Sequence, residues 1–348
     1  MVSTPRTVGQ EAGVSGPPVL LTRRRWLIRG VQLLVTIGIV AWLLGQLNLQ
    51  ALQGRVVVPA VLPLLGMVGT AWLFVLLGGI KFWVLHQGLT PVRFASFITH
   101  FVVATAFGAF TPASLGDFSL AALLRREQIP VHESMAVMVV DRVVTLSMYA
   151  MIFLPLMFGL LLHTAHLWWV SVSVMVMVAL LLVLNRVGAV RQLVQRVLEH
   201  LSLPFLPAFL ATTSALLRQH PWHLLGNVGL TFVRCLVSGL VVQCALWAVG
   251  EYPPFLPVLS TTNTIAILNL LPVSLAGFGV YESGGVTLLG LLGLQREHVF
   301  VALVYQRVYV LLSSCVILAF AYLYAGKTGW LRGHAGTPNH DSTRASLL

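Results

Sequence analysis

A series of long apolar stretches dominates this chain and limits what it can fold into. They cover roughly residues 27–47, 56–80, 132–161, 166–184, 222–249 and 298–325. Each stretch is close to the about 20 mostly apolar residues that an α-helix needs to cross a bilayer. Hydrophobic residues make up 57% of the chain and charged residues only 9%, against about 25% charged in soluble domains. We therefore predict an all-α polytopic membrane protein with about six full transmembrane helices, and a water-soluble enzyme is excluded.

Two further apolar stretches, 94–124 and 255–293, are broken in the middle. The first break reads T-P-A-S-L-G-D (Thr111 to Asp117) and the second reads L-P-V-S-L-A-G-F-G (Leu271 to Gly279). The backbone groups freed by such a break are tolerated in a membrane only against protein or a water-filled cavity. The residues expected to break the helices are Pro112, Gly116, Pro272, Gly277 and Gly279.

Each broken stretch is either one crossing or a re-entrant hairpin, and the distribution of Lys and Arg separates the two topologies. With two hairpins and both termini in the cytosol, sixteen of the 21 basic residues lie inside, Lys81 among them. Only Arg55 and Arg296 then lie outside, and three arginines lie within the membrane. With two single crossings the ratio falls to ten inside against eight outside. Because basic residues gather in cytoplasmic loops, we predict two re-entrant helical hairpins.

The two breaks resemble each other at an offset of 160 residues. The matched pairs are Pro112 and Pro272, Ser114 and Ser274, Leu115 and Leu275, and Phe118 and Phe278. Each break is followed by a spanning helix with an arginine, Arg142 in V-V-D-R-V-V and Arg307 in V-Y-Q-R-V-Y. Three crossings between the copies would invert the second one. Chance matching of apolar letters is the alternative to the inverted repeat that we predict, with copies at about 56–161 and 222–325, as in many transporters.

The remaining segments are expected on the cytosolic side. Residues 1–22 and 327–348 are polar, and we expect a disordered cytosolic N-terminus and tail around a single membrane domain at 23–326. The basic loop 186–220 has amphipathic spacing, which suits an interfacial helix or an extension of the preceding helix. No small-residue cleavage site follows the basic start. We therefore predict an uncleaved first helix in a multi-pass protein of the cytoplasmic (inner) membrane.

Charged residues inside the apolar stretches are the candidate site. A central charge costs at least about 2.5–3.5 kcal/mol, so each needs a partner or water. Mutual pairing that locks the helices is one interpretation, and a hydrated site that binds an anionic lipid headgroup is the other. Arginine suits a phosphate because its planar fork donates two hydrogen bonds at once. The charged candidates are Arg142, Arg307, Glu282, Asp117, Asp141 and Arg234. Polar residues around the breaks support a lined cavity and complete the set, namely Ser114, Ser274, Asn269 and Tyr281.

Other function classes leave no signal in the sequence. The three cysteines lie in apolar segments without C-x-x-C spacing, and there is no H-E-x-x-H, G-x-S-x-G or P-loop. We therefore expect no catalytic residue, no metal and no cofactor. The formal charge of +11 comes from basic residues in loops and tails, which suits membrane lipids as partners and not nucleic acid.

Together these motifs resemble the flippase-like membrane domain of lysylphosphatidylglycerol synthases, over roughly residues 25–325. The resemblance rests on T-P-A-S-L-G-D-F…L-L-R-R, V-V-D-R-V-V, L-P-V-S-L-A-G-F-G-V-Y-E-S and Y-Q-R. Its most specific part is L-P-x-S-x-x-G-x-G-x-x-E at the second break. The chain departs from the family pattern at Asp141, where members often carry Glu, and at Ala276, where many have Gly.

The resemblance implies a transporter that moves a polar-headgroup lipid between leaflets, whether a phospholipid, a hopanoid or a polyprenyl-linked lipid. The soluble aminoacyl-transferase domain of the full synthases has no counterpart here, so we expect a stand-alone member that does not make lysyl-lipid. The alternative is an integral-membrane enzyme of lipid modification, or an accessory subunit of a lipid-glycosylating enzyme, with Asp117 or Glu282 as a base. A purely structural role for the paired charges is the third hypothesis.

Overall fold

The computed structural model describes residues 59–111, 115–163, 219–268 and 279–328, with isolated helical residues at 38, 41, 45, 172–174, 176, 212–213 and 215–216. The described parts are helical and contain no strand. Four of their helical runs are long and apolar enough to cross a membrane, namely Val61–Gln87, Val131–Leu161, Pro221–Ala248 and Arg296–Leu323. The prediction of an all-α membrane protein is confirmed. The predicted crossings at 27–47 and 166–184, the loop 186–220 and both tails lie almost wholly outside the described residues.

The described helices follow the same order twice, a long helix, two short helices and a long helix. The first series is α3 (Val61–Gln87), α4 (Phe94–Gly108), α5 (Leu115–Leu124), the 3-10 turn η1 (Arg125–Glu127), and a continuous run of α6 (Val131–Met148), the π-helix η2 (Tyr149–Phe153) and α7 (Leu154–Leu161). The second series is α11 (Pro221–Ala248), α12 (Phe255–Leu268), α13 (Val280–Leu291) and α14 (Arg296–Thr328).

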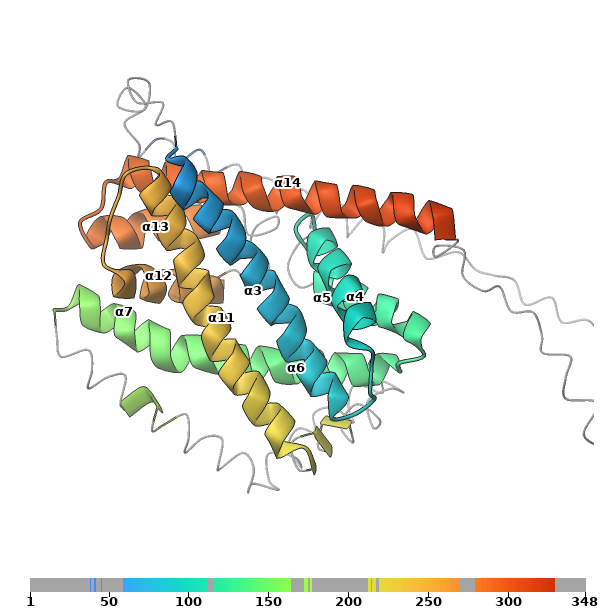
Figure 1. The fold of residues 1–348 in the computed structure, drawn as a ribbon. Coiled ribbons are helices and arrows are strands. Elements are labelled where there is room, and N and C mark those ends of the chain that lie inside the picture. Colours follow the sequence, from blue (N-terminus) through green and yellow to red (C-terminus); the bar gives the residue numbers. More distant parts are fainter. Residues whose placement is uncertain are drawn as a thin grey trace, which may run out of the picture.

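Helices α3 and α11 lie side by side and antiparallel at the centre of the molecule (Figure 1). The Ala60 N–H donates to the Ala248 carbonyl at 3.0 Å, at one end of the pair. Gly66 faces α11 closely, because a Cβ added there would lie 3.3 Å from the Sγ of Cys244. Gly226, 160 residues later, faces α3 in the same way, with a Cβ 3.3 Å from Val84. Small residues allow membrane helices to approach closely, and the antiparallel course is the one that an inverted copy requires.

Both glycines lie in a second pair of matching segments, which precede the breaks in the sequence and are also 160 residues apart. The text L-L-G-M-V-G begins at Leu64, and L-L-G-N-V-G begins at Leu224. The inverted repeat and its boundaries nevertheless stay a prediction.

The four short helices occupy the two broken stretches. They contain 15, 10, 14 and 12 residues, and each is shorter than the about 17 residues that a crossing needs. Helix α4 packs on α5 and α12 packs on α13, while the breaks at 112–114 and 269–278 lie outside the described residues. Re-entry of each pair from one face stays a prediction.

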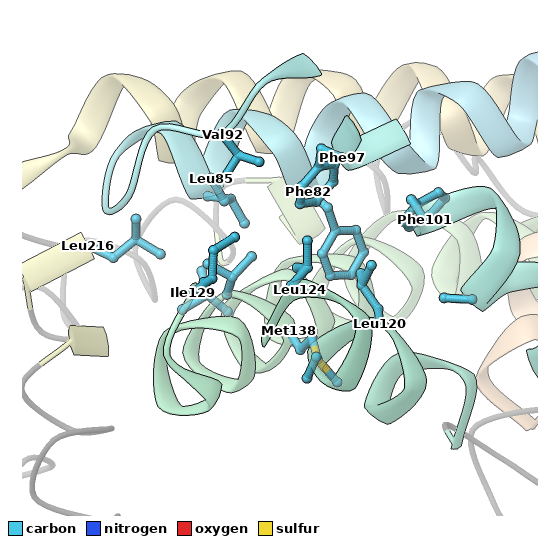
Figure 2. Packing of buried hydrophobic residues seen from close by; sticks show 14 residues of the cluster. Phe82, Leu85, Val92, Phe97, Phe101, Leu120, Leu124, Ile129, Met138 and Leu216 are labelled. Atoms are coloured by element: carbon cyan, nitrogen blue, oxygen red, sulfur yellow. The ribbon is translucent and has the colours of Figure 1, made fainter. Parts of the chain in front are cut away.

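The two series of helices interlock. Helix α14 reaches across to α4 of the first series, and η2 and α7 pack against α12 of the second (Figure 1). A buried apolar cluster joins α3, α4, α5 and α6 within the first series, and Figure 2 shows Phe82, Leu124 and Met138 at its centre. Packing of this kind supports helix association in a bilayer, where lipid tails are as apolar as the side chains. It fixes the helices that carry the charged residues.

Helix α3 is longer than the sequence indicated. The predicted crossing ended at residue 80, which placed Lys81 in a cytosolic loop. The structure continues α3 to Gln87, so Lys81 lies inside the helix, with 1% of its surface exposed. Lys81 therefore cannot be counted among the basic residues of a cytosolic loop when the topology is predicted.

Candidate functional site

A charged cavity of about 230 Å³ lies between α3, α4, α5, α6 and α11. We call it the cationic cavity. Its charged lining consists of Lys81 on α3, Asp141 and Arg142 on α6, and Arg234 on α11. The aromatic rings of Phe74, Phe82, Phe101 and Tyr149 surround these groups. Three cations and one carboxylate thus line one space inside the membrane-spanning helices.

Lys81 and Asp141 form a buried ion pair that joins three helices. The Lys81 Nζ lies 2.8 Å from the Asp141 Oδ1, and it donates a hydrogen bond to the Thr145 hydroxyl at 3.1 Å. From α11, the Asn227 side-chain amide donates to the same Asp141 oxygen at 2.9 Å and to the Lys81 carbonyl at 3.3 Å. The side chains of Lys81 and Asp141 are 1% and 3% exposed. A charge at this depth needs such compensation.

Arg234 is held in the same cavity by an uncharged residue. Its Nε donates to the Phe74 carbonyl at 3.3 Å, and its guanidinium carbon lies 3.8 Å from the centre of the Phe74 ring. Stacking on an aromatic face orients the guanidinium by a cation–π interaction and leaves its charge in place. Gly78 provides the room, because a Cβ there would lie 3.2 Å from the Arg234 Nε.

A second cavity of about 310 Å³ lies between α3, α4, α11, α12, α13 and α14. We call it the apolar cavity, because its lining is mostly hydrophobic. Its polar groups include Tyr281, Gln306 and Arg307. The Arg307 guanidinium carbon lies 5.7 Å from the centre of the Tyr281 ring.

Glu282 orients Arg307 and lies in the first turn of helix α13 (Val280–Leu291). One carboxylate oxygen accepts from the Arg307 Nε at 2.9 Å, and the other accepts from the Gly279 backbone N–H at 2.8 Å. Gly279 has a φ of 83°, a conformation that glycine adopts without steric cost. A negative side chain in the first turn also suits the positive end of the helix dipole. The second break therefore ends in a contact that orients the arginine.

Four residues, Phe74, Val75, Thr105 and Tyr149, line both cavities. We call them the partition. Tyr149 opens the π-helix η2, two residues before Met151. Pro155 follows η2 and has no N–H for the Met151 carbonyl, and its ring crowds that carbonyl, which explains the wider turn. Such π-turns are frequent at functional sites.

The structure brings five of the ten predicted site residues into these two cavities and a sixth beside them. Arg142, Arg234 and Asp141 line the cationic cavity, Arg307 and Tyr281 line the apolar cavity, and Glu282 holds Arg307. Ser114, Ser274 and Asn269 lie outside the described residues, as does the side chain of Asp117. The same applies to Pro112, Pro272 and Gly277, whereas Gly116 lies in α5 and Gly279 caps α13.

Sequence reasoning missed Lys81, Asn227 and Tyr149. Lys81 and Asn227 are lone polar residues in apolar helices, and this isolation could have marked them as site residues. Tyr149 gives no signal of its own, although Pro155 marks the distorted turn beside it. Within the described residues no group of three or more His, Cys, Asp or Glu could hold a metal ion.

Comparison with known proteins gives one result. No curated protein and no solved structure matches this chain. The family model described as lysylphosphatidylglycerol synthase TM region matches residues 30–317, a range that contains both cavities.

Proposed function

Because the chain belongs to the lysylphosphatidylglycerol synthase TM region family, we propose that it is a transporter that moves a polar-headgroup lipid between the two leaflets. The family and the long apolar helices identify the chain as a lipid-related, multi-pass membrane protein.

The observation that carries this proposal is the pair of adjoining cavities with different linings. A lipid is an amphiphile, so it needs a polar space for its headgroup and an apolar one for its chains. The cationic cavity supplies guanidinium and ammonium groups, and the apolar cavity beyond the partition supplies a hydrophobic lining with one arginine. Ionisable groups inside membrane spans are rare, and substrate pathways are one of the functional sites that they mark.

Arg142 and Arg307 occupy matching places in this arrangement. Both lie on the long helix after a break, and one lines each cavity. A headgroup that leaves Arg142 and crosses the partition meets Arg307 next, with the hydroxyls of Thr105 and Tyr149 between them. Glu282 keeps the Arg307 side chain oriented during this transfer.

The test is lipid movement in vesicles that contain the purified full chain. Lipids labelled on one acyl chain are distributed over both leaflets, and a membrane-impermeant reductant bleaches only the outer leaflet. We expect the wild type to expose the inner pool and Arg307→Gln to slow this exposure about ten- to a hundredfold, the effect of losing a charge-assisted hydrogen bond.

The exposed residue Arg93 provides the matched control, because Arg93→Gln also removes one positive charge. Wild-type movement by a correctly folded Arg307→Gln variant would refute the mechanism. Chemical change of the lipid in the same vesicles would support the lipid-modifying enzyme instead.

A further inference from the structure

We infer that the cationic cavity binds an anionic lipid headgroup and a proton together, the headgroup at Arg234 and the proton on Asp141. This inference deepens the proposed function and rests on it for the transport step, which a proton gradient could then drive. Binding of the headgroup and uptake of the proton can both be measured without transport.

Arg234 is the anchor for the headgroup. Its guanidinium carbon lies 3.8 Å from the centre of the Phe74 ring, and its Nε donates to the Phe74 carbonyl at 3.3 Å. Both groups are uncharged, so they orient the guanidinium without neutralising it. The hydrogen bond uses the Nε donor, and the terminal nitrogens carry the further donors that suit two oxygens of a phosphate. One guanidinium is enough for a headgroup with one negative charge.

Asp141 is placed to take up the proton. It lines the same cavity as Arg234. Its ion pair with Lys81 at 2.8 Å and its hydrogen bond from Asn227 at 2.9 Å both use Oδ1. A proton can therefore bind to Oδ2 while Oδ1 goes on accepting from both donors, as the carbonyl oxygen of a carboxylic acid does. The contacts between α3, α6 and α11 need not break when Asp141 becomes neutral.

The two binding events depend on each other because they share Lys81. Before a headgroup binds, Asp141 balances the Lys81 ammonium. A headgroup anion in this cavity of about 230 Å³ brings a second negative charge near Asp141, and like charges in a poorly solvated site repel strongly. A proton from solution removes this repulsion, because it makes Asp141 neutral. The headgroup then balances Lys81 instead, so one anion and one proton enter together and the total charge stays the same.

Lys81 can contact the headgroup without leaving its present partners. Its ammonium has three N–H donors. The contacts with the Asp141 Oδ1 and with the Thr145 hydroxyl use two of them. Lys81 also lines the cavity, so the third donor suits an oxygen of the headgroup.

Other ionisable groups lie near Asp141, and none of those that the structure describes is a second carboxylate. They are Lys81 on α3, Arg234 and Cys235 on α11, Tyr149 on η2 and Arg142 on α6. The side chain of Asp117 on α5 lies outside the described residues. The experiment therefore has to identify the proton-binding group by substitution.

Proton uptake during lipid binding to the detergent-purified full chain tests the inference. A pH-indicating dye in weakly buffered solution reports the protons. Short-chain phosphatidylglycerol supplies one negative charge, and zwitterionic phosphatidylcholine is the comparison. We expect uptake that approaches one proton for each phosphatidylglycerol bound, and none for phosphatidylcholine. Because linkage is reciprocal, the affinity for phosphatidylglycerol should fall as the pH rises, by up to about tenfold per pH unit.

Variants assign the two roles. Asp141→Asn should bind phosphatidylglycerol without proton uptake and without this dependence on pH. Where the single variant does not fold, Asp141→Asn combined with Lys81→Met replaces it, and it should also bind without uptake. Arg234→Gln should weaken phosphatidylglycerol about ten- to a hundredfold and change phosphatidylcholine less than about twofold. Glu127→Gln removes an exposed carboxylate and should keep the uptake of the wild type.

The outcomes separate the proton site from the proposed transport. Wild-type proton uptake by a folded Asp141→Asn variant would overturn the inference, because another group would then bind the proton. Wild-type protein that does not bind phosphatidylglycerol, or binds it without uptake, would overturn it as well, even if lipid moves in the vesicle assay. Proton uptake that depends on Asp141, without lipid movement in vesicles, would refute the proposed transport and support the proton site.

Discussion

Neutralising one partner of the Lys81–Asp141 pair should destabilise the protein more than neutralising both. Asp141→Asn keeps the shape of the side chain and removes its charge, so Lys81 is left as a buried cation with 1% of its surface exposed. Lys81→Met leaves Asp141 as a buried anion with the Asn227 amide as its described donor. The double variant removes both charges and leaves two side chains of similar volume.

The distance sets the scale of the effect. Two unit charges 2.8 Å apart attract by about 6 kcal/mol at an effective dielectric constant of 20. Desolvation of both ions offsets much of this attraction, so the pair adds little net stability over apolar residues. Loss of one partner removes the attraction but keeps the desolvation of the other, at a cost of about 3–5 kcal/mol. The double variant should lose less than about 2 kcal/mol, because neither member of the pair is left buried without the other.

The free energy of unfolding is measured in mixed micelles of a mild detergent and dodecyl sulfate, followed by tryptophan fluorescence. Glu127→Gln is the control, since this exposed carboxylate accepts from the Ser96 hydroxyl at 2.7 Å. Its loss should cost no more than about 1 kcal/mol. A double variant that loses the sum of the two single effects would refute the ion-pair reasoning, as would an Asp141→Asn variant as stable as the wild type.

Two glycine positions give further predictions, each measured against Gly69→Ala, where an added Cβ meets nothing within 4 Å. Gly78→Ala places a Cβ 3.0 Å from the Phe101 Cζ and 3.2 Å from the Arg234 Nε, so the ring and the guanidinium must both shift by a few tenths of an ångström. Lipid movement in the vesicle assay should slow about three- to tenfold, because the charge of Arg234 stays but its position changes. The free energy of unfolding should fall by less than in Gly239→Ala, because the crowded atoms are side-chain ends. Gly239→Ala places a Cβ 3.1 Å from the Leu259 Cα, a backbone atom that cannot yield cheaply. We expect a loss of about 1–3 kcal/mol in the free energy of unfolding, and a stability equal to that of Gly69→Ala would contradict it.

The features that the sequence predicted are those with local signals. Apolar length marks a spanning helix, and proline and glycine mark a break, so the long helices and the arginines on them were found without contacts. Arg142 and Arg307 stood out because each interrupts an apolar run at a comparable depth. The structure places each of them in a cavity, and their role in binding a lipid stays a proposal.

The missed features depend on contacts between distant residues. A search for apolar runs ends α3 before Lys81, because this is its first charged residue. The helix continues to Gln87, because Asp141, 60 residues later, compensates the charge of Lys81. Asn227 lies 86 residues from Asp141 and has a role only in the folded protein. The partition likewise joins side chains from α3, α4 and η2. These groups of residues come together only when the helices pack, and no single stretch of sequence shows how the helices pack.

The differences between the two halves matter as much as their likeness. Both cavities have an arginine at the matching place, but Gln306 precedes Arg307 where Asp141 precedes Arg142. Val241 and Phe74 likewise stand at the positions that match Lys81 and Arg234. A ligand shifts an equilibrium only by the difference in its affinity for the two states. On the proposed mechanism, an anionic headgroup is therefore held more tightly in the cationic cavity than at Arg307.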